Sequence, residues 1–339
     1  MNNLPISKKS SAHSKVGMVV VNWNSYEILA QCLSSLAKQT LSFVRVVVVD
    51  NGSEPQLKHL TCARPENTEY VKLPSNNGFA RANNIAFNML QDCEWIALAN
   101  PDTFLEPDWL ENMVSGIDCF PDFSFFSSIL IQANNCSFFD GLGDVYHTSG
   151  LAWKDAHGWG LNQLSVYERE IFSPCAAAAI YKREALQEVG GFDEDYFCYY
   201  EDVDLGFRLR LAGHRCMLLP SAVAHHVGFA TTEGGNSNFV IYHGHRNLVW
   251  TYIKNMPGIF FWLYLPQHCL LNMYNIFHLI LSGKGWVILR AKYNAIKGIP
   301  VMWRKRALIQ ANKNVTGSVI LKQMAKGLGS IISRTPPSI

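Results

Sequence analysis

Three unbroken apolar runs, each ending near a polar side chain, constrain the fold of this chain more than any other feature. The runs are VGMVVVNW (16–23), FVRVVVVD (43–50) and WIALAN (95–100). Uninterrupted apolar strands are typical of a sheet that is covered on both faces. A helical spacing of apolar residues lies between the first two runs, and another helix is expected at 79–90, before the third. This alternation predicts an α/β fold with a doubly wound, mostly parallel sheet flanked by helices.

Polar side chains follow these strands at the edge where a doubly wound sheet binds its ligands. Asn22, Asp50 and Asp102 all lie at or just beyond the carboxyl end of an expected strand. Pro101 has no backbone donor and cannot continue a central strand, so Asp102 is expected beyond the strand end. A turn or a helix cap is the alternative explanation for Asp102. Because carboxylates in such a crevice suit a nucleotide with its metal, a nucleotide site is expected here.

The sequence argues against two common nucleotide-binding motifs and against a disulfide-bonded domain. No GxGxxG follows the first strand, and no GxxxxGK[ST] occurs in the chain. The nine cysteines are scattered singly, without a CxxC pair, as expected in a reducing compartment. The polar N-terminus lacks the apolar centre of a signal peptide, so the protein is expected to stay in the cytoplasm.

Charge divides the chain into two parts. Residues 234–339 hold 13 of the 29 Lys and Arg residues and none of the 27 acids, although the net charge of the whole chain is only +2. We therefore expect a polar N-terminal tail (1–15), an α/β domain that carries the expected nucleotide site (16–233) and a basic, helical C-terminal extension (234–339).

The extension contains an apolar, aromatic segment (258–283) that is expected to lie at a membrane surface. Six polar or helix-breaking residues favour an interfacial helix over a spanning one: Pro266, Gln267, His268, Asn272, Asn275 and His278. Basic residues that could meet anionic headgroups follow the segment: Lys284, Arg290, Lys292, Lys297, Arg304, Lys305 and Arg306. The prediction is peripheral attachment to an anionic membrane, on the cytoplasmic face of the inner membrane. A pair of helices packed on the core is the alternative. Nucleic acid is another partner for the charge, but it is not expected because the basic residues flank apolar aromatic ones.

Five motifs follow one another in an informative order: VVVNWNS, VVVVDNGS, NNGFARANN, ANPD and GGFDEDYFCYYEDVDLGFRLRLAGHRCMLLPSAVAHH. Their order and spacing resemble the inverting family 2 glycosyltransferases of the GT-A fold, most closely the bacterial rhamnosyltransferase-like group. The resemblance covers about residues 16–306, and the long last motif is its most specific part. It implies a nucleoside-diphosphate sugar as donor, either dTDP- or UDP-linked, and a divalent metal, Mg²⁺ or Mn²⁺.

The resemblance assigns residues near the strand ends to the donor: Asn22, Trp23, Asp50, Asn77, Gly78 and Arg81. Asp50 would accept a hydrogen bond from the N3–H of uracil or thymine, which selects against cytosine because its N3 carries no hydrogen. Trp23 could stack on that base. Gly78 would permit close approach, and Arg81 could hold phosphate oxygens. A surface salt bridge is an equally good explanation for Arg81.

Metal binding is implied for Asp102 and for one histidine. Family members usually carry Asp-x-Asp where this chain has Asn100-Pro101-Asp102, so a neutral Asn100 lies beside the implied metal-binding carboxylate. His225 and His226 follow an expected strand and match the position of a metal-binding imidazole. His225 is preferred over His226.

The segment EDVDLGFRLRLAG carries the implied catalytic centre. The resemblance places the catalytic base on Asp202, with Glu201 supporting or orienting the acceptor and Asp204 pointing away. Inverting transfer needs one carboxylate to take the acceptor proton. A helix cap is the alternative, because acids are favoured in a first helical turn. Small residues of SPCAAAAIYKREAL are expected at the donor floor, and the segment 141–160 is expected to form a loop near the acceptor.

The expected function is transfer of L-rhamnose from dTDP-rhamnose to a lipid-linked saccharide acceptor. The product would serve a cell-surface polysaccharide of the O-antigen (lipopolysaccharide) or capsule type. One alternative is a transferase that uses another donor, such as a UDP-hexose. Another is a catalytically silent sugar-nucleotide-binding scaffold, against which the joint presence of Asp50, Asp102 and Asp202 argues.

Overall fold

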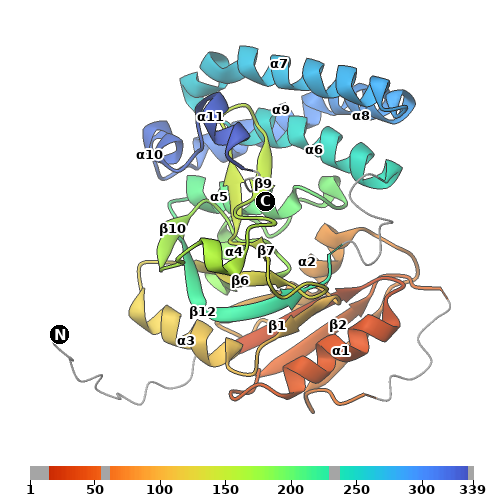
Figure 1. Ribbon diagram of the computed structural model, residues 1–339, viewed down its shortest axis with the longest axis vertical. Helices are drawn as coiled ribbons and strands as arrows, with labels where there is room; N and C mark the ends of the chain where they lie inside the picture. Colours follow the sequence, from red (N-terminus) through yellow and green to blue (C-terminus); the bar gives the residue numbers. More distant parts are fainter. Residues whose placement is uncertain (1–14, 55–61, 229–236, 335–339) are drawn as a thin grey trace.

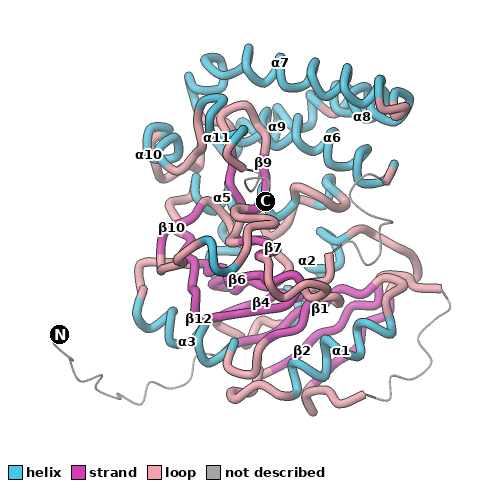
Figure 2. The backbone as a smooth tube through the Cα atoms, viewed as in Figure 1, coloured by secondary structure: helices cyan, strands magenta, loops and turns pink. Residues whose placement is uncertain are grey.

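A computed structural model describes residues 15–54, 62–228 and 237–334, and shows a large sheet with a layer of helices at one end (Figure 1). Residues 1–14 of the expected tail and the expected domain boundary at 233/234 lie outside the described residues. Figure 2 shows that strands gather in one half of the molecule and that the other half is almost wholly helical.

The strands are β1 (Val16–Asn22), β2 (Arg45–Asp50), β3 (Thr68–Lys72), β4 (Trp95–Ala99), β5 (Thr103–Leu105), β6 (Phe125–Gln132), β7 (Phe139–Gly141), β8 (Asp144–Tyr146), β9 (Ala152–Lys154), β10 (Arg169–Ile171), β11 (Ala178–Lys182) and β12 (Cys216–His226). The α-helices are α1 (Tyr26–Ala37), α2 (Phe79–Met89), α3 (Trp109–Cys119), α4 (Arg183–Glu188), α5 (Glu201–Leu211), α6 (Asn238–Asn255), α7 (Gly258–Leu281), α8 (Gly285–Lys297), α9 (Ile299–Ala311), α10 (Gly317–Lys322) and α11 (Gly327–Ile332). Short 3₁₀ helices span Leu161–Gln163 and Glu194–Tyr196.

The main sheet is mixed, and the four strands at its β3 end run parallel to one another. Its order is β10-β12-β6-β11-β4-β1-β2-β3, with β5 paired to β12 and β7 to β6. β3, β2, β1 and β4 run parallel, and Asn22 lies opposite Asp50. Beyond β4 the directions are mixed: β11 is antiparallel to both β4 and β6, whereas β12 is parallel to β6. The expected strands β1, β2 and β4 are confirmed, and their carboxyl ends meet at one edge.

Apolar side chains cover both faces of this sheet. α1 and α3 pack on one face, through Leu33 and Trp109 among others. α2 and α5 pack on the other, through Ala82 and Leu209. All residues of β1 are buried. Burial from both sides explains why the strands are read as unbroken apolar runs.

The turn after β4 brings Asp102 next to the end of β12. The N–H of Thr103 donates to the carbonyl of Asn100 at 3.1 Å, and the chain enters β5 at once. β5 pairs with the end of β12, where Thr103 lies opposite His226. Both histidines therefore belong to β12 rather than following a strand. Pro220 interrupts β12 at a bulge, a position where a strand tolerates proline.

The C-terminal helices are layered on α5 and not on the sheet. Phe207 and Leu211 of α5 share an apolar cluster with Trp250 and Tyr252 of α6 and Met302 of α9. α8 and α9 pack on α6, and α7 packs on α8. Figure 1 shows α7 as the outermost of these helices, farthest from the sheet. Among the helices that the structure describes, none combines the length and hydropathy needed to cross a membrane.

An apolar outer face covers α7, α8 and α9. We use this name for the exposed aliphatic side chains of these helices and for the exposed aromatic residues Trp262, Tyr274, Phe277, Trp286, Tyr293 and Trp303. Such a concentration of exposed apolar side chains marks an interaction surface.

Three of the basic residues expected to meet lipid headgroups instead bind other groups of the protein. Lys292 and Arg306 are buried and donate to carbonyl and amide oxygens of neighbouring helices. Lys305 forms ion pairs with two carboxylates near the start of α5. The expected headgroup contact is therefore wrong for Lys292 and Arg306, whereas Arg290 and Arg304 are exposed.

Candidate active site

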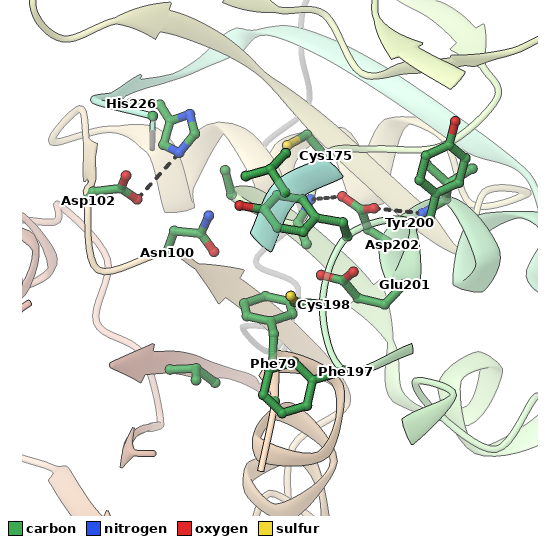
Figure 3. Close-up of a pocket in the computed structure, with 18 of the residues that line it drawn as sticks. Phe79, Asn100, Asp102, Cys175, Phe197, Cys198, Tyr200, Glu201, Asp202 and His226 are labelled. Carbon is green, nitrogen blue, oxygen red and sulfur yellow. Dashed lines mark hydrogen bonds and ion pairs between the residues drawn. The ribbon is translucent and has the colours of Figure 1, made fainter. Parts of the chain in front are cut away.

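A cavity of about 520 Å³ lies beyond the carboxyl ends of β1 and β4 and reaches the start of α5 (Figure 3). This volume suits a small-molecule ligand. Residues from separate sequence motifs line it together: Trp23, Gly78, Asn100, Asp102, Cys175, Ala176, Ala177, Glu201, Asp202 and His226. In Figure 3, Asp102 and His226 lie on one side of the cavity and Glu201 and Asp202 on the other.

Asp102 and His226 form one end of a buried chain of polar side chains. His226 Nε2 lies 3.4 Å from Asp102 Oδ1, and His226 Nδ1 lies 2.7 Å from Asp140 Oδ2. Lys154 Nζ contacts the same Asp140 oxygen at 2.6 Å. Burial lowers the pKa of His226, but its hydrogen bonds with Asp102 and Asp140 outweigh burial and raise that pKa overall. Asp140 therefore fixes the orientation of the imidazole that faces Asp102.

The preference for His225 over His226 is wrong. Successive side chains of a strand point to opposite faces, so only one of the two histidines can face the cavity. His226 does so, whereas His225 Nε2 lies 2.6 Å from Glu106 Oε1 and its Nδ1 lies 3.8 Å from the thiol of Cys136. The glutamate holds His225 away from Asp102.

Asn100 supplies an uncommitted oxygen between the two sides of the cavity. Its Oδ1 is buried and has no hydrogen-bond partner among the residues that the structure describes. An unpaired buried oxygen is costly unless a ligand or ion completes it. Amide and carboxylate oxygens are ordinary ligands of Mg²⁺ and Mn²⁺, and imidazole suits transition metals. Asn100, Asp102 and His226 therefore fit a divalent ion, although the described residues contain no group of three or more His, Cys, Asp or Glu side chains arranged to hold one.

Three carboxyl groups share the other side of the cavity. Asp202 accepts hydrogen bonds from the N–H groups of Val203 at 2.8 Å and Ala176 at 3.4 Å. Oε2 of Glu201 is buried without a partner among the described residues. Asp144, from the start of β8, is buried and accepts a bond from Ser173. Because none of the three is paired with a cation at contact distance in the described part of the chain, these groups disfavour one another's ionisation.

The environment separates the three carboxyls by acidity. Burial raises the pKa of all three. For Glu201 and Asp144 the charge of Asp202 adds to burial, and each pKa lies well above its usual range. For Asp202, the two backbone N–H groups that donate to its carboxylate act against burial. The pKa of Asp202 is therefore raised less than the pKa values of Glu201 and Asp144. Asp202 is thus the group best suited to be ionised and to accept a proton.

Asp202 is not the N-cap residue of α5, but it lies in the first helical turn, so the alternative of an acid favoured by the helix dipole stays open. Tyr200 occupies the N-cap position of α5 and makes no side-chain capping bond. Asp204 points away from the cavity, as expected, into a buried cluster with Arg208, Lys254 and Asn255.

Replacing Glu201 by Gln is expected to stabilise the protein at neutral pH. The pKa of Glu201 is higher in the folded state than in the unfolded state. The protonated carboxyl therefore contributes fully to the free energy of unfolding below about pH 4, and this contribution is lost as pH rises through the folded-state pKa. Glu201→Gln removes this loss and should raise Tm at pH 8 by on the order of 2 °C, with a smaller gain at pH 4.5. Thermal unfolding of the exposed-site control Glu184→Gln should show no such pH-dependent gain. A lower Tm at pH 8 for Glu201→Gln would contradict the assigned burial effect.

The residues expected at the donor base lie beside the cavity. Asp50 is buried, and its carboxylate accepts bonds from Tyr26 at 2.9 Å and Ser53 at 2.5 Å. Asn22 contacts the same carboxylate at 3.5 Å. Trp23 lines the cavity. The structure thus brings Asn22, Trp23 and Asp50 together at the ends of β1 and β2.

Some residues in and before the start of α2 line the cavity, and others lie at the surface. Gly78 lines the cavity with φ of +84°, and a Cβ there would lie 2.6 Å from the carbonyl oxygen of Phe197. Asn76 lines the cavity and Asn77 does not, because the amide of Asn77 turns to the carbonyl of Ser75. Arg81 is exposed and lies 3.9 Å from Glu194, which matches the surface salt bridge given as its alternative.

Sequence reasoning missed part of the site. Asp144, Trp153 and Lys154 line the cavity from the β8–β9 hairpin. Phe197 and Tyr199 line it from the segment before α5. The expectation of a loop at 141–160 is thus corrected to a segment that contains this hairpin. The cluster of aromatic residues in both segments was the available signal.

Comparisons with known proteins show the family of this chain. Residues 18–190 match the family described as "Glycosyl transferase family 2". The chain is 26% identical over 247 residues to N-acetylglucosaminyl-diphospho-decaprenol L-rhamnosyltransferase of Mycobacterium tuberculosis, covering 67% of this chain and 80% of that protein. It is 25% identical over 229 residues to rhamnosyltransferase WbbL of Escherichia coli, covering 62% and 83%.

A solved structure supports the fold. The structure of GalNAc-T7 with UDP, GalNAc and Mn²⁺ superposes with a TM-score of 0.57 at 13% identity, over 72% of this chain and 48% of that one. The combination of a mixed sheet, flanking helices and the family match confirms the expected GT-A fold. The protein is therefore a glycosyltransferase and belongs to glycosyl transferase family 2.

Proposed function

We propose that this protein transfers L-rhamnose, with inversion, from dTDP-rhamnose to a lipid-linked saccharide. The observation that carries the proposal is the cavity in which Asp202 faces the Asn100, Asp102 and His226 cluster. A base and an anion-binding end on opposite sides of one cavity are what a single displacement requires. The choice of sugar is supported by the names of both relatives, and the choice of a lipid-linked acceptor by the name of the Mycobacterium tuberculosis relative.

The proposed chemistry begins with the acceptor hydroxyl against Asp202. Asp202 takes the hydroxyl proton as the oxygen attacks the anomeric carbon from the face opposite the diphosphate. Glu201 presents its buried Oε2 to the same region and orients the acceptor. No covalent intermediate forms, and the configuration at the anomeric carbon inverts.

The donor diphosphate is proposed to lie near Asn100, Asp102 and His226. A bound Mg²⁺ or Mn²⁺ would supply neutralising charge to that diphosphate. Asp140 holds His226 through its Nδ1, as the second partners of metal-bound imidazoles commonly do. Asp50 is proposed to accept N3–H from thymine or uracil, which both bases carry, so a UDP-hexose remains the alternative donor.

The most direct test of this function uses membranes that contain the full chain. They are incubated with labelled dTDP-rhamnose and with a panel of labelled UDP-sugars, and lipid is then extracted. Label from dTDP-rhamnose in the lipid extract is expected. Label from a UDP-sugar alone would show that the donor is that UDP-sugar and not dTDP-rhamnose. Nucleotide binding without transfer from any donor would favour the silent scaffold.

Membrane contact is proposed to occur through the apolar outer face. Residues 234–339 contain no acidic residue, and Arg290, Lys297 and Arg304 remain exposed beside aromatic side chains. Aromatic and basic residues together suit the interface of an anionic bilayer. This placement would put the enzyme on the surface that holds a lipid-linked acceptor. Attachment to the cytoplasmic face of the inner membrane is part of the proposal.

Replacing Trp262 and Trp286 together by Ser is expected to weaken vesicle binding. Their side chains are exposed at 61% and 80%, so burial in lipid would contribute strongly. Binding of the full chain to vesicles with anionic lipid should fall about tenfold or more, measured by co-sedimentation. Tyr167→Ser, at an equally exposed aromatic residue of the catalytic part, is the matched control and should bind normally. Unchanged binding of the double variant would rule out this face as the membrane contact. If the wild type bound neutral and anionic vesicles equally, attraction between its basic residues and anionic lipid would be excluded.

A further inference from the structure

The segment that leads into the catalytic helix has an unusual backbone. Phe197, Tyr199 and Tyr200 have φ values of +67°, +63° and +68°. Bulky residues rarely adopt positive φ, and each such residue costs roughly 1–3 kcal/mol unless its surroundings impose the conformation. We call residues 197–200 the pre-helix loop. Its side chains line the cavity, and Glu201 and Asp202 follow it directly.

A single asparagine of α6 donates hydrogen bonds to carbonyl groups of this loop and of Tyr196, the residue before it. Asn247 is fully buried, and its Nδ2 donates to the carbonyl oxygens of Tyr196 at 3.0 Å, Cys198 at 2.9 Å and Tyr199 at 2.7 Å. Three convergent carbonyl oxygens repel one another and need a donor between them. The amide of Asn247 is that donor.

The neighbouring arginine fixes the orientation of the amide. Arg246 Nε donates to Asn247 Oδ1 at 2.9 Å, so the amide nitrogen must face the loop. The same guanidinium donates to the carbonyls of Asp195 at 3.2 Å and Tyr196 at 2.8 Å. Its Cζ lies 4.2 Å from the ring centroid of Trp250, which holds the arginine in place.

One stripe of α6 continues these contacts on both sides of Asn247. The ring of His243 stacks on Phe197 with centroids 5.2 Å apart. One turn after Asn247, Thr251 lies 3.0 Å from the hydroxyl of Tyr196. Lys254 then meets Asp204 within α5 at 2.7 Å. The spacing of three to four residues keeps these groups on one helical face.

We infer that Asn247 is a positioning residue of the transferase: it holds the pre-helix loop in the conformation that presents Glu201 and Asp202 to the cavity. Through Asn247, the C-terminal extension is part of the scaffold of the active site as well as the bearer of the apolar outer face. The part of the inference that is tested by sugar transfer rests on the proposed function. The part that is tested by amide hydrogen exchange of the loop does not depend on that function.

The test compares Asn247→Asp and Asn247→Ser with wild type in the full chain. Asp has the same shape but turns an oxygen toward three carbonyls, so kcat should fall by about 10²-fold while dTDP or UDP binding stays within about threefold. Ser keeps one donor and should lose less. The acid limb of the kcat–pH profile should shift in both variants, because the surroundings of Asp202 change. Amide hydrogen exchange of residues 196–201 should accelerate.

Asn294→Asp is the matched control. Its amide donates to the hydroxyl of Tyr242 at 3.0 Å and contacts no part of the pre-helix loop. This variant should keep the wild-type kcat, pH profile and loop exchange. If Asn247→Asp does not fold, Asn247→Ser decides the question.

A purely structural role gives a different result and would overturn the inference. In that case the Asn247 variants would have a lower Tm but wild-type kcat, pH profile and loop exchange. Failure of the wild type to transfer sugar from any donor would instead refute the proposed function. The exchange measurement would then still decide whether Asn247 holds the loop.

Discussion

Asp202→Asn is expected to lower the rate of sugar transfer by about 10² to 10⁴-fold. Asparagine keeps the shape of the side chain and an oxygen that can accept from Val203 N–H, but it cannot take a proton. Binding of dTDP or UDP should barely change, because the donor base is expected at the ends of β1 and β2. Both quantities should be measured on one preparation, so that intact binding shows that the fold is preserved.

The comparison variant for this prediction is Glu201→Gln. It alters the adjacent carboxyl, which lacks the two backbone donors of Asp202, and should lower the rate less than Asp202→Asn. An active Asp202→Asn enzyme would transfer the role of base to Glu201. If both variants stayed active, the start of α5 would not be the catalytic centre.

Asp102→Ala is expected to lower both transfer and donor affinity, by about 10²-fold or more in rate. It removes the carboxylate that faces the proposed diphosphate position. Chelation by EDTA should abolish transfer in the wild type, and added Mg²⁺ or Mn²⁺ should restore it. Full activity in EDTA would contradict a metal requirement.

The two histidines of β12 provide a matched pair for the same prediction. His226→Ala should raise the metal concentration needed for half-maximal activity by about 10 to 100-fold, because it removes the imidazole beside Asp102. His225→Ala should have little effect, because His225 contacts Glu106 and not the cavity. Equal effects of the two substitutions would show that neither histidine acts through Asp102.

Three of the four parallel strands β3, β2, β1 and β4 could be predicted, all but β3, because the physical cause is local in the sequence. Strands buried on both faces must be apolar along their length, and β1, β2 and β4 are apolar between their terminal residues. The place of Asp102 followed from Pro101, which cannot continue a central strand. These features needed no knowledge of distant parts of the chain.

The choice between His225 and His226 could not be made in the same way. Which of two neighbours faces the cavity depends on the alternation of side chains along β12. The bulge between Leu219 and Val223 changes that alternation, and the sequence does not reveal where the bulge lies. Pairing with β5, more than 100 residues earlier, then determines which histidine meets Asp102.

Asp144 and Asn247 were missed for a related reason. Asp144 stands on a short hairpin strand without a motif of its own, and only the fold brings it beside Asp202. Asn247 lies about 50 residues after the loop that it contacts. Arg81 is a case in which the sequence left two explanations open, phosphate binding and a surface salt bridge, and its side chain lies at the surface beside Glu194.

The anomeric configuration of the product tests the account most directly. The lipid-linked product made from dTDP-rhamnose is isolated, and the configuration at the rhamnose anomeric carbon is determined by NMR and compared with that of the donor. A single displacement with Asp202 as base predicts the opposite configuration in the product. A product with the donor's configuration would contradict the account, because retention requires a second displacement or attack from the face of the leaving diphosphate.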